Sequence, residues 1–456
     1  MLRKNLDNIF FIFLISHLII WTIVPSISNI NLPLDTIEHL AWSTNLSWGY
    51  TKHPPVIAVV LRFFYQIFGS NDWAYYFVSQ LFICISFYFV WRLSEEFFRD
   101  KVLSILSVLL LELIIFHNYT SPEFNVYICQ LPFKVLTVYF CWKSINEKNY
   151  LNWFLFGIFA ALGFLTHYSF LYIILAIKFF FIIKIIEEKK FYAVYFIPGI
   201  IFFLILLPHL YWLYENNFTT ISYALDRTGM ASKQIIDHLL NPFIFTLKQI
   251  GILIPFFLVV GILIKKIKFK INFKDRKTLF LIYINLIPIL LVIITSLITG
   301  AKIRTMWMST FYLFFGILIL YIFKKNFYLK NIKKFFFIFT FLFFISPVTY
   351  LYVSLSNDFK RTDYPGKEIS RLVQNKWNKN FSNEIDVVIG DSWFAGNLSY
   401  HLETRPIWLQ TLDDNLSKIN PNSGFVYTGN PKVLKKTCPG VFGVIKPVGY
   451  CMIGSK

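Results

Sequence analysis

Long apolar runs separated by short charged loops are the feature that most constrains the fold of this 456-residue chain. Hydrophobic residues make up 56% of the sequence and aromatic residues 20%, whereas charged residues make up only 15%. A soluble protein of this size cannot bury so much apolar surface, so the runs must also face lipid. The sequence therefore predicts an α-helical polytopic membrane protein and excludes disordered, collagen-like and small disulfide-rich chains.

We count about eleven apolar runs that are long enough to cross a bilayer. The first covers residues 9–27. The apolar segment 55–69 carries Arg62 and ends early, so we expect an interfacial helix there and not a span. The remaining spans are predicted to start near Trp73, Val102, Asn125, Leu151, Tyr168, Ala193, Asn241, Leu279, Trp307 and Phe335.

The distribution of positive charge predicts how the chain crosses the membrane. The net charge is +19, and alternate short loops hold about 22 basic residues on one side against about five on the other. The basic side, which includes the amino terminus, is predicted to be cytoplasmic. Residues 28–54, 117–124 and 215–240 then lie outside. Basic runs such as 265–270 are topology signals that face anionic lipid, and no nucleic acid partner is expected.

The composition changes after residue 356. Aromatic runs stop, and residues 387–391 and 425–427 have the pattern of short strands between turn signals. We predict two parts, a transmembrane module over residues 1–356 and a small extracytoplasmic α/β domain over residues 357–456.

The five cysteines divide between these two parts. Cys84, Cys129 and Cys141 fall in predicted spans and are expected to be packing residues. Cys438 and Cys451 would lie in an oxidising compartment, where a disulfide is plausible, but spacing alone leaves it undecided.

The first external loop contains two carboxylates three residues apart, Asp35 and Glu38. One interpretation is a capping box, with Asp35 as the N-cap of a helix and Glu38 reaching back to its backbone. In the other, a carboxylate just outside the first span faces a lipid-borne substrate and acts as a general base. The residues alone favour neither.

Glu123, in the next external loop, also has two interpretations. Ser121 as N-cap and Pro122 at the first helical position would make it a carboxylate that complements a helix dipole. Alternatively, Glu123 pairs with Asp35 as an orienting group, or the two carboxylates bind a hard divalent cation.

Several basic residues stand out because they lie on the side with little positive charge. Lys302 and Arg304 have no acidic neighbour in their own loop, so a substrate phosphate or a lipid phosphate is a natural partner. The alternative is snorkelling to headgroups, with Trp307 in the aromatic belt. Arg227 is either a second phosphate contact or the partner of Asp226.

The sequence lacks several common catalytic signatures. Cysteine and histidine spacings match no zinc site, and there is no phosphate-binding or dinucleotide-binding loop and no nucleophile elbow. His167 and Tyr168, at an external turn, are equally compatible with interfacial packing and with ligand binding.

In their order along the chain, these segments resemble bacterial GT-C glycosyltransferases, the superfamily of protein O-mannosyltransferases and of the aminoarabinose transferase that acts on lipid A. The first external loop has the acidic opening and the aromatic stretch before a Pro-Pro pair that are typical of this family. The resemblance rests on residues 34–39, 48–55, 120–123, 163–168 and 302–307, and in the tail on 362–367 and 390–397. There are two departures: Lys52 replaces the acidic residue of members with a described metal site, and His167 stands where lysine is commoner.

The resemblance implies an inverting transferase of the GT-C fold in the bacterial inner membrane, with its amino terminus in the cytoplasm. A single sugar would move from a polyprenyl phosphate to a hydroxyl of lipid A, lipopolysaccharide, another envelope glycan or a protein. The implied catalytic residues are Asp35, as base, and Glu123. No cofactor is certain, and a divalent metal ion is left open. The implied substrate-binding residues are Glu38, Tyr50, Lys52, His53, His117, Asn118, His167, Tyr168, Arg227, Lys302, Arg304 and Trp307.

Two other functions fit parts of the pattern. A transporter of envelope lipid or polysaccharide should carry ionisable residues near the membrane midplane, where Lys134, Lys178 and Lys248 are unpaired in sequence and could snorkel. A ligase that moves whole glycan chains, as O-antigen ligases do, would also need cations on the external side. The Asp35 region is the feature that separates these functions.

Overall fold

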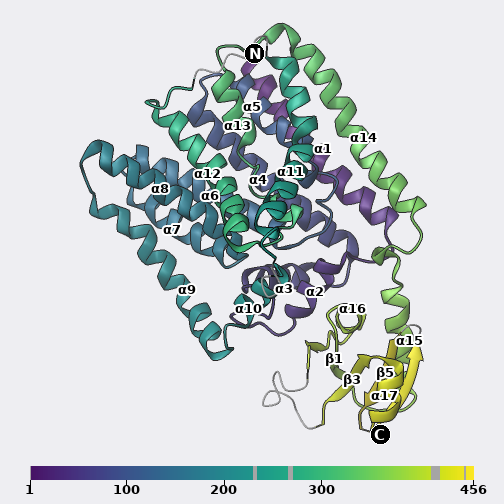
Figure 1. Ribbon diagram of the computed structural model, residues 1–456. Helices are drawn as coiled ribbons and strands as arrows, with labels where there is room; N and C mark the ends of the chain where they lie inside the picture. The colour runs from purple at the N-terminus through teal and green to yellow at the C-terminus, as the bar shows by residue number, and fades with distance from the viewer. Residues whose placement is uncertain (1, 230–233, 265–270, 412–421, 446–447, 456) are drawn as a thin grey trace.

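The computed structural model describes residues 2–229, 234–264, 271–411, 422–445 and 448–455. It has a large bundle of helices with a small sheet at one end (Figure 1). Some of the residues predicted to form basic cytoplasmic runs, 265–270, lie outside the described ranges. The α-helices of the bundle are α1 (Leu2–Ser28), α2 (Leu34–Trp42), α3 (Val56–Phe68), α4 (Asp72–Phe97), α5 (Lys101–Leu109), α6 (Val126–Asn146), α7 (Tyr150–Phe164), α8 (Leu171–Glu188), α9 (Ile197–Glu215), α10 (Thr219–Arg227), α11 (Asp237–Leu263), α12 (Arg276–Thr299), α13 (Phe315–Phe323) and α14 (Ile332–Ser356).

The predicted fold class is confirmed, whereas the count of eleven spans is not. Seven helices among the described residues are long and apolar enough to cross a membrane: α1, α4, α8, α9, α11, α12 and α14, with η3 (Tyr168–Phe170) and η4 (Ala193–Phe196) extending α8 and α9. Helix α7 has 15 residues, and α5 and α13 have nine each. The run expected to cross from Val102 breaks into α5, η1 (Leu110–Leu113) and η2 (Ile115–His117).

Local capping residues explain where several helices begin. The Asn125 side chain accepts hydrogen bonds from the backbone N–H groups of Tyr127 and Ile128 and so starts α6. Asp100 and Asn149 cap α5 and α7 in the same way. Each cap satisfies an N–H group that the first turn of a helix leaves without a partner.

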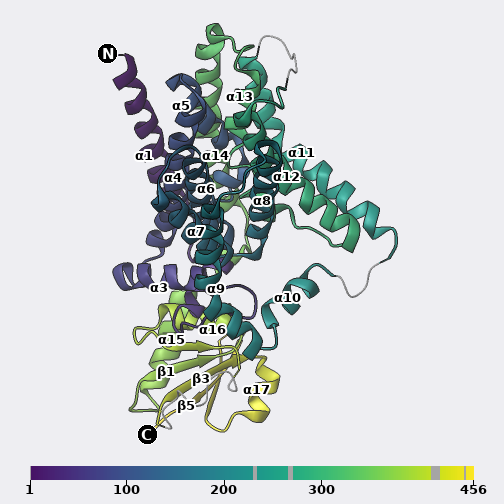
Figure 2. The same cartoon turned by 90° about the vertical axis from the view of Figure 1, so that its left-hand side faces the viewer.

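Helix α3 lies across the end of the bundle at which the sheet lies, and not along the bundle axis (Figure 2), and α2 lies at the same end (Figure 1). This arrangement confirms the interfacial helix expected over residues 55–69. Helix α3 buries Val56, Ile57, Ala58 and Leu61, while Phe63 and Ile67 remain exposed. One apolar face thus packs on the bundle, and the other is available to lipid.

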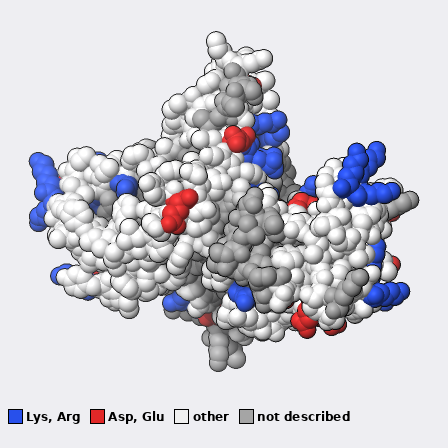
Figure 3. All heavy atoms as spheres, turned by 90° about the horizontal axis from the view of Figure 1, so that it is seen from below, with Lys and Arg blue, Asp and Glu red and all other residues white. Residues whose placement is uncertain are grey.

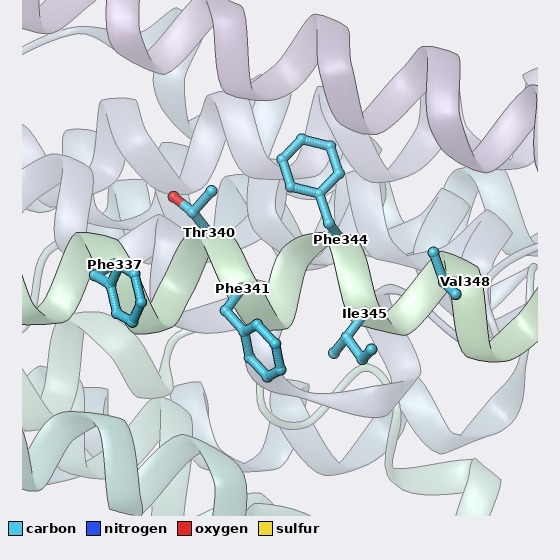
Figure 4. Close-up of a pocket in the computed structure, with 6 residues that line it drawn as sticks. All are labelled: Phe337, Thr340, Phe341, Phe344, Ile345 and Val348. Atoms are coloured by element: carbon cyan, nitrogen blue, oxygen red, sulfur yellow. The ribbon is translucent and has the colours of Figure 1, made fainter.

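Helix α14 is largely exposed on the outside of the bundle. A hollow of about 420 Å³ lies on its surface, and all six lining residues come from this one helix (Figure 4). They are Phe337, Thr340, Phe341, Phe344, Ile345 and Val348. A shallow surface with a single hydroxyl group matches the lipid-facing side of a span.

The carboxyl-terminal residues fold around a five-stranded sheet of order β2-β1-β3-β5-β4. The parallel strands are β1 (Ile385–Ile389), β2 (Ile407–Leu409) and β3 (Gly424–Gly429), and β5 (Val448–Ile453) runs antiparallel to both β3 and β4 (Val441–Ile445). The helices of this region are α15 (Gly366–Asn378), α16 (Phe394–His401) and α17 (Pro431–Thr437). Both predicted strand segments are confirmed.

The cysteines follow their expected division. Cys438 and Cys451 form a disulfide with a Cα–Cα distance of 5.6 Å, which settles the pairing that the sequence left undecided. Cys84, Cys129 and Cys141 are free and buried, as expected for packing residues.

The sheet region docks onto α2 through α16. Gly396 permits the close approach, because a Cβ atom there would lie 3.2 Å from Ile37 and 3.4 Å from Ala41. The buried Arg405 guanidinium donates to the Leu40 carbonyl at 2.6 Å and lies 4.1 Å from the centre of the Tyr65 ring. A cation at the carboxyl end of α2 also complements the helix dipole. The carboxyl-terminal region therefore fixes the helix that carries Asp35.

Candidate active site

Asp35 lies in the first turn of α2 but does not cap it. The N-cap is Pro33, and no side chain accepts a capping hydrogen bond there. The capping interpretation of Asp35 is therefore wrong, since a helix that begins at Leu34 places Asp35 two positions after the N-cap, Pro33. The carboxylate of Asp35 is left available for other contacts.

Glu123 comes before α6 and is not part of it. The helix begins at Val126 with Asn125 as N-cap, so the interpretation with Ser121 as cap and Pro122 in the first turn is also wrong. Instead, Glu123 Oε1 accepts a hydrogen bond of 3.1 Å from the backbone N–H of Asp35. The structure thus brings together the two carboxylates assigned to catalysis, although 88 residues separate them.

Both carboxyl groups hold their protons more tightly than they would in water. Burial and the neighbouring Glu38 raise the pKa of Asp35 to about 6, against the opposing charges of Lys52, Arg361 and Arg227. Burial and the Asp35 charge raise the pKa of Glu123 to about 8. Between these values Asp35 is ionised while Glu123 retains its proton. One group can then accept a proton and the other can donate a hydrogen bond.

Glu38 and Lys52, both predicted to bind substrate, form an ion pair with each other at 2.5 Å. Glu38 is only 5% exposed and also accepts a hydrogen bond from the Ser392 hydroxyl. Ser392 is held in place because the Asp391 carboxylate accepts from the N–H groups of Trp393 and Phe394. The carboxyl-terminal region therefore reaches directly into this cluster.

Aromatic and imidazole rings form the wall beside α2. Tyr50 stacks on Trp42 with ring centres 4.9 Å apart, and its hydroxyl lies 3.2 Å from the Trp42 carbonyl. The rings of His53 and His167 have centres 5.3 Å apart. Burial lowers the pKa of His167 to about 4 and that of His53 well below its usual value, so both rings are neutral at pH 7. Tyr50 closes the loop, and the two histidines add no positive charge.

Tyr168 joins the first loop to α9. Its hydroxyl lies 2.7 Å from His209 Nε2, and His209 Nδ1 lies 2.6 Å from the carbonyl of Trp48. His209 escaped the sequence analysis because it lies within an apolar run, where its only signal is being a polar residue among aliphatic ones.

His117 and Asn118 point into the protein. His117 is fully buried, and its Nδ1 lies 3.1 Å from the Leu111 carbonyl. The Asn118 amide donates to the Glu112 carbonyl. These bonds hold the loop that carries Glu123, and a contact of either residue with substrate stays a prediction.

Three predicted phosphate-binding cations, Arg227, Lys302 and Arg304, lie on two linked segments near this site: the Arg227 charge acts on Asp35, and the charges of Asp35, Arg227 and Arg304 all act on Tyr127. Lys302 N–H donates to the Thr228 carbonyl at 3.3 Å, which joins the loop of Arg304 to the end of α10, where Arg227 lies. Among the described residues, no carboxylate forms an ion pair with any of these three cations. Trp307 lies in η6 (Thr305–Met308), which Arg304 precedes. The arrangement leaves these cations available for an anionic ligand.

Arg361 is a further cation that the sequence did not single out. It lies in η8 (Arg361–Asp363), directly after the bundle, and its charge acts on both Asp35 and Glu123. The next residue, Thr362, accepts through its carbonyl from the N–H groups of Ile30 and Asn31. The only sequence signal was the tail motif 362–367, which begins one residue later.

A second hollow, of about 430 Å³, lies beside the Arg304 loop. It is mostly apolar and contains one cation. Its lining residues are Leu113, Ile115, Lys248, Gly251, Ile252, Pro255 and Thr305. Thr305 places one end of this apolar groove next to Arg304.

Comparisons with known proteins agree with this architecture. Residues 52–212 match the family described as dolichyl-phosphate-mannose-protein mannosyltransferase. Among solved structures, the chain is similar to ArnT from Cupriavidus metallidurans in the apo state, with a TM-score of 0.62 and 9% sequence identity over 99% of this chain and 98% of that one. The chain has the fold of a GT-C glycosyltransferase. No curated protein matches its sequence.

Seven helices in the described part of the chain are long and apolar enough to cross a membrane, which together with the ArnT-like fold indicates a multi-pass membrane protein. Within the described part of the chain, no three His, Cys, Asp or Glu side chains are grouped as metal ligands. A divalent ion held by Asp35 and Glu123 needs only one or two carboxylates, so it stays a prediction.

Proposed function

We propose that this GT-C protein is an inverting glycosyltransferase that moves one sugar from a polyprenyl phosphate to a hydroxyl of an envelope acceptor. The acceptor is lipid A, lipopolysaccharide, another glycan or a protein. The structural similarity to ArnT, a lipid A aminoarabinose transferase, favours the first two. The observation that carries the proposal is the Asp35–Glu123 pair beside cations without carboxylate partners.

The transfer exchanges one bond for another at the anomeric carbon. The acceptor oxygen attacks from the face opposite the phosphate, the bond from carbon to phosphate oxygen breaks, and Asp35 takes the hydroxyl proton. The raised pKa of Asp35, about 6, leaves it ionised at pH 7 and makes it a stronger base than an ordinary aspartate. Glu123, protonated at that pH, orients the acceptor by donating a hydrogen bond.

The leaving group needs positive charge more than it needs an acid. Polyprenyl phosphate departs as an anion, which Arg304, helped by Lys302 and Arg227, stabilises where the charge develops. The apolar groove that ends at Thr305 suits the hydrocarbon of the carrier, and Lys248 on its wall adds a cation. Tyr50, His53, His167 and Tyr168 would line the sugar side of the same space.

The same proposal includes the orientation of the chain. We place the protein in the bacterial inner membrane with its amino terminus in the cytoplasm and the sheet region outside. The excess of basic residues in loops on the amino-terminal side supports this orientation. Seen from the end that carries the sheet, Lys and Arg side chains are scattered over a mostly uncharged surface (Figure 3).

The decisive experiment supplies the purified protein in liposomes with polyprenyl-phosphate sugars and envelope acceptors. We expect transfer of one sugar with inverted anomeric configuration, detected by mass spectrometry and NMR. Transfer of a whole glycan chain would favour the ligase, and movement of lipid without any transfer would favour the transporter. Comparing envelope glycolipids with and without the gene should then identify the missing sugar.

A further inference from the structure

A second ionisable pair lies inside the bundle, away from the candidate active site. His17 Nδ1, on α1, is 2.9 Å from Glu112 Oε2, in η1, and the two side chains are 0% and 1% exposed. Every other ion pair among the described residues exposes at least one partner substantially. Placing two such groups in the membrane interior is costly, so a specific role is expected.

The hydrogen bonds around His17 determine the charge of this pair. The Gln80 amide nitrogen donates to the Ser121 carbonyl at 3.2 Å, so its oxygen is an acceptor that faces His17 Nε2 at 3.1 Å. Nε2 must therefore carry a hydrogen. One more proton lies between Nδ1 and the Glu112 carboxyl, on either atom, because two bare acceptors would repel. The pair is consequently neutral overall and suits the bilayer interior.

Glu112 lies where a span is interrupted. The chain leaves α5 at Leu109 and runs through two short 3-10 helices before α6. Irregular backbone at membrane depth needs partners inside the protein. The backbone carbonyl of Glu112 accepts from the Asn118 amide, and its side chain is tied to α1 through His17. Glu112 thus ties the interrupted segment both to α1 and to its own following turn at Asn118.

Hydrogen bonds from this pair reach Ser121, which is two residues before the catalytic Glu123 in the same loop. Gln80 links His17 to Ser121, and the hydroxyl of Ser79 also donates to the Ser121 carbonyl, at 2.5 Å. Two residues later, Glu123 accepts the backbone N–H of Asp35. Movement of Ser121 would therefore move Glu123 relative to Asp35.

We propose that the Glu112–His17 pair, acting through Gln80, is a positioning device that sets Glu123 against Asp35. The proposal rests on the proposed transferase function. The pair itself touches no substrate, and what it supplies is geometry rather than charge. A hydrogen-bonding replacement should therefore keep the function, whereas an apolar one should lose it.

The test compares three variants with a matched control. Glu112→Leu and Gln80→Leu remove the link, and each should lower kcat by about tenfold to a hundredfold with an unchanged KM for donor, because small misplacements of reacting groups are costly. Glu112→Gln keeps a donor for His17 Nδ1 and should retain kcat within about threefold. The control is Asp7→Leu, which breaks the Lys101–Asp7 ion pair of 2.7 Å between α1 and α5 at the other end of the bundle.

Hydrogen exchange over residues 118–124 provides a readout that does not depend on activity. We expect faster exchange in Gln80→Leu and Glu112→Leu but not in Asp7→Leu or Glu112→Gln. Full kcat together with unchanged exchange in Gln80→Leu would overturn the proposal, even if Glu112→Leu fails to fold. If the wild-type protein transfers no sugar, the proposed function fails, and the exchange data alone then decide whether the pair positions this loop.

Discussion

The two ends of the helical bundle differ in how their charged residues are paired. At the amino-terminal end, Lys101 pairs with Asp7 at 2.7 Å, and Lys143 lies within 2.8 Å of both Glu96 and Glu147. At the end that carries the sheet, Arg304 has no carboxylate partner among the described residues, and Asp35 makes no ion pair there. The sheet end also has ion pairs, Lys52–Glu38 and Lys360–Asp363, but it leaves Asp35 and Arg304 available.

This contrast distinguishes charges that orient the chain in the membrane from charges that are available to bind a ligand. Paired and partly exposed charges contribute little free energy beyond orienting the chain in the membrane. Carboxylates whose pKa is raised, next to cations that have no carboxylate partner, are typical of functional sites that bind a ligand. The Lys52–Glu38 ion pair, which is close to Asp35, contacts the sheet region through Ser392. The sheet end is therefore where substitutions should change activity most.

The largest effect is expected from Asp35→Asn. Removing the base should lower the transfer rate by about a hundredfold to ten-thousandfold, while donor binding and thermal stability stay near wild type. Transfer is measured in liposomes, and donor affinity is measured by titration. The matched control is Asp358→Asn, an exposed carboxylate outside the site. Undiminished transfer by Asp35→Asn would remove Asp35 as the base.

Arg304→Ala should have the next largest effect. Loss of one charge-assisted contact should weaken donor binding by about tenfold to a hundredfold and leave acceptor affinity unchanged. Arg92→Ala serves as the control, because Arg92 is paired with Glu95 at 2.7 Å on an exposed surface. If both substitutions leave donor affinity unchanged, Arg304 only contacts headgroups and the contrast between the ends loses its functional meaning.

The sequence predicted the helices better than it predicted the site. The start of α6 follows from its own cap, Asn125, and strand β1 follows from a short β-branched run, so both depend on local residues. The contact of Asp35 with Glu123 depends on how α2 packs, which no local pattern encodes. The sequence identified tail residues such as Ser392 only as part of a motif that resembles the family.

For one of the four runs that were wrongly counted as spans, the run near Val102, the miscount has a specific cause. The run that begins near Val102 is apolar on average, but Glu112, His117 and Asn118 fall where it would cross the bilayer. In the structure this segment is largely buried and is broken into α5 and two short 3-10 helices, so most of its apolar residues pack inside the protein and not on lipid. Average hydropathy cannot distinguish these two environments.

A smaller effect concerns the pH dependence of transfer. Because Asp35 must be ionised and Glu123 protonated, the rate should rise with pH through the Asp35 pKa of about 6 and fall again above the Glu123 pKa of about 8. The Glu38 charge raises this pKa and the Lys52 charge lowers it. Glu38→Gln should therefore move the acid limb to lower pH, and Lys52→Gln should move it to higher pH. Rates from pH 4.5 to 9 measure both shifts, and shifts in the same direction would contradict the assignment of Asp35.

The smallest expected effect is the one that tests the carboxyl-terminal region. The Arg361 charge lowers the pKa of Asp35, but less than Lys52 does, and its side chain is exposed to screening solvent. Arg361→Gln should move the acid limb upward by less than Lys52→Gln, and the shift should shrink as salt is added. Arg371→Gln, on α15, is the matched control. An equal response of both variants would mean that the sheet region only holds α2 in place, whereas a shift confined to Arg361→Gln would mean that it also sets the charge balance at the base.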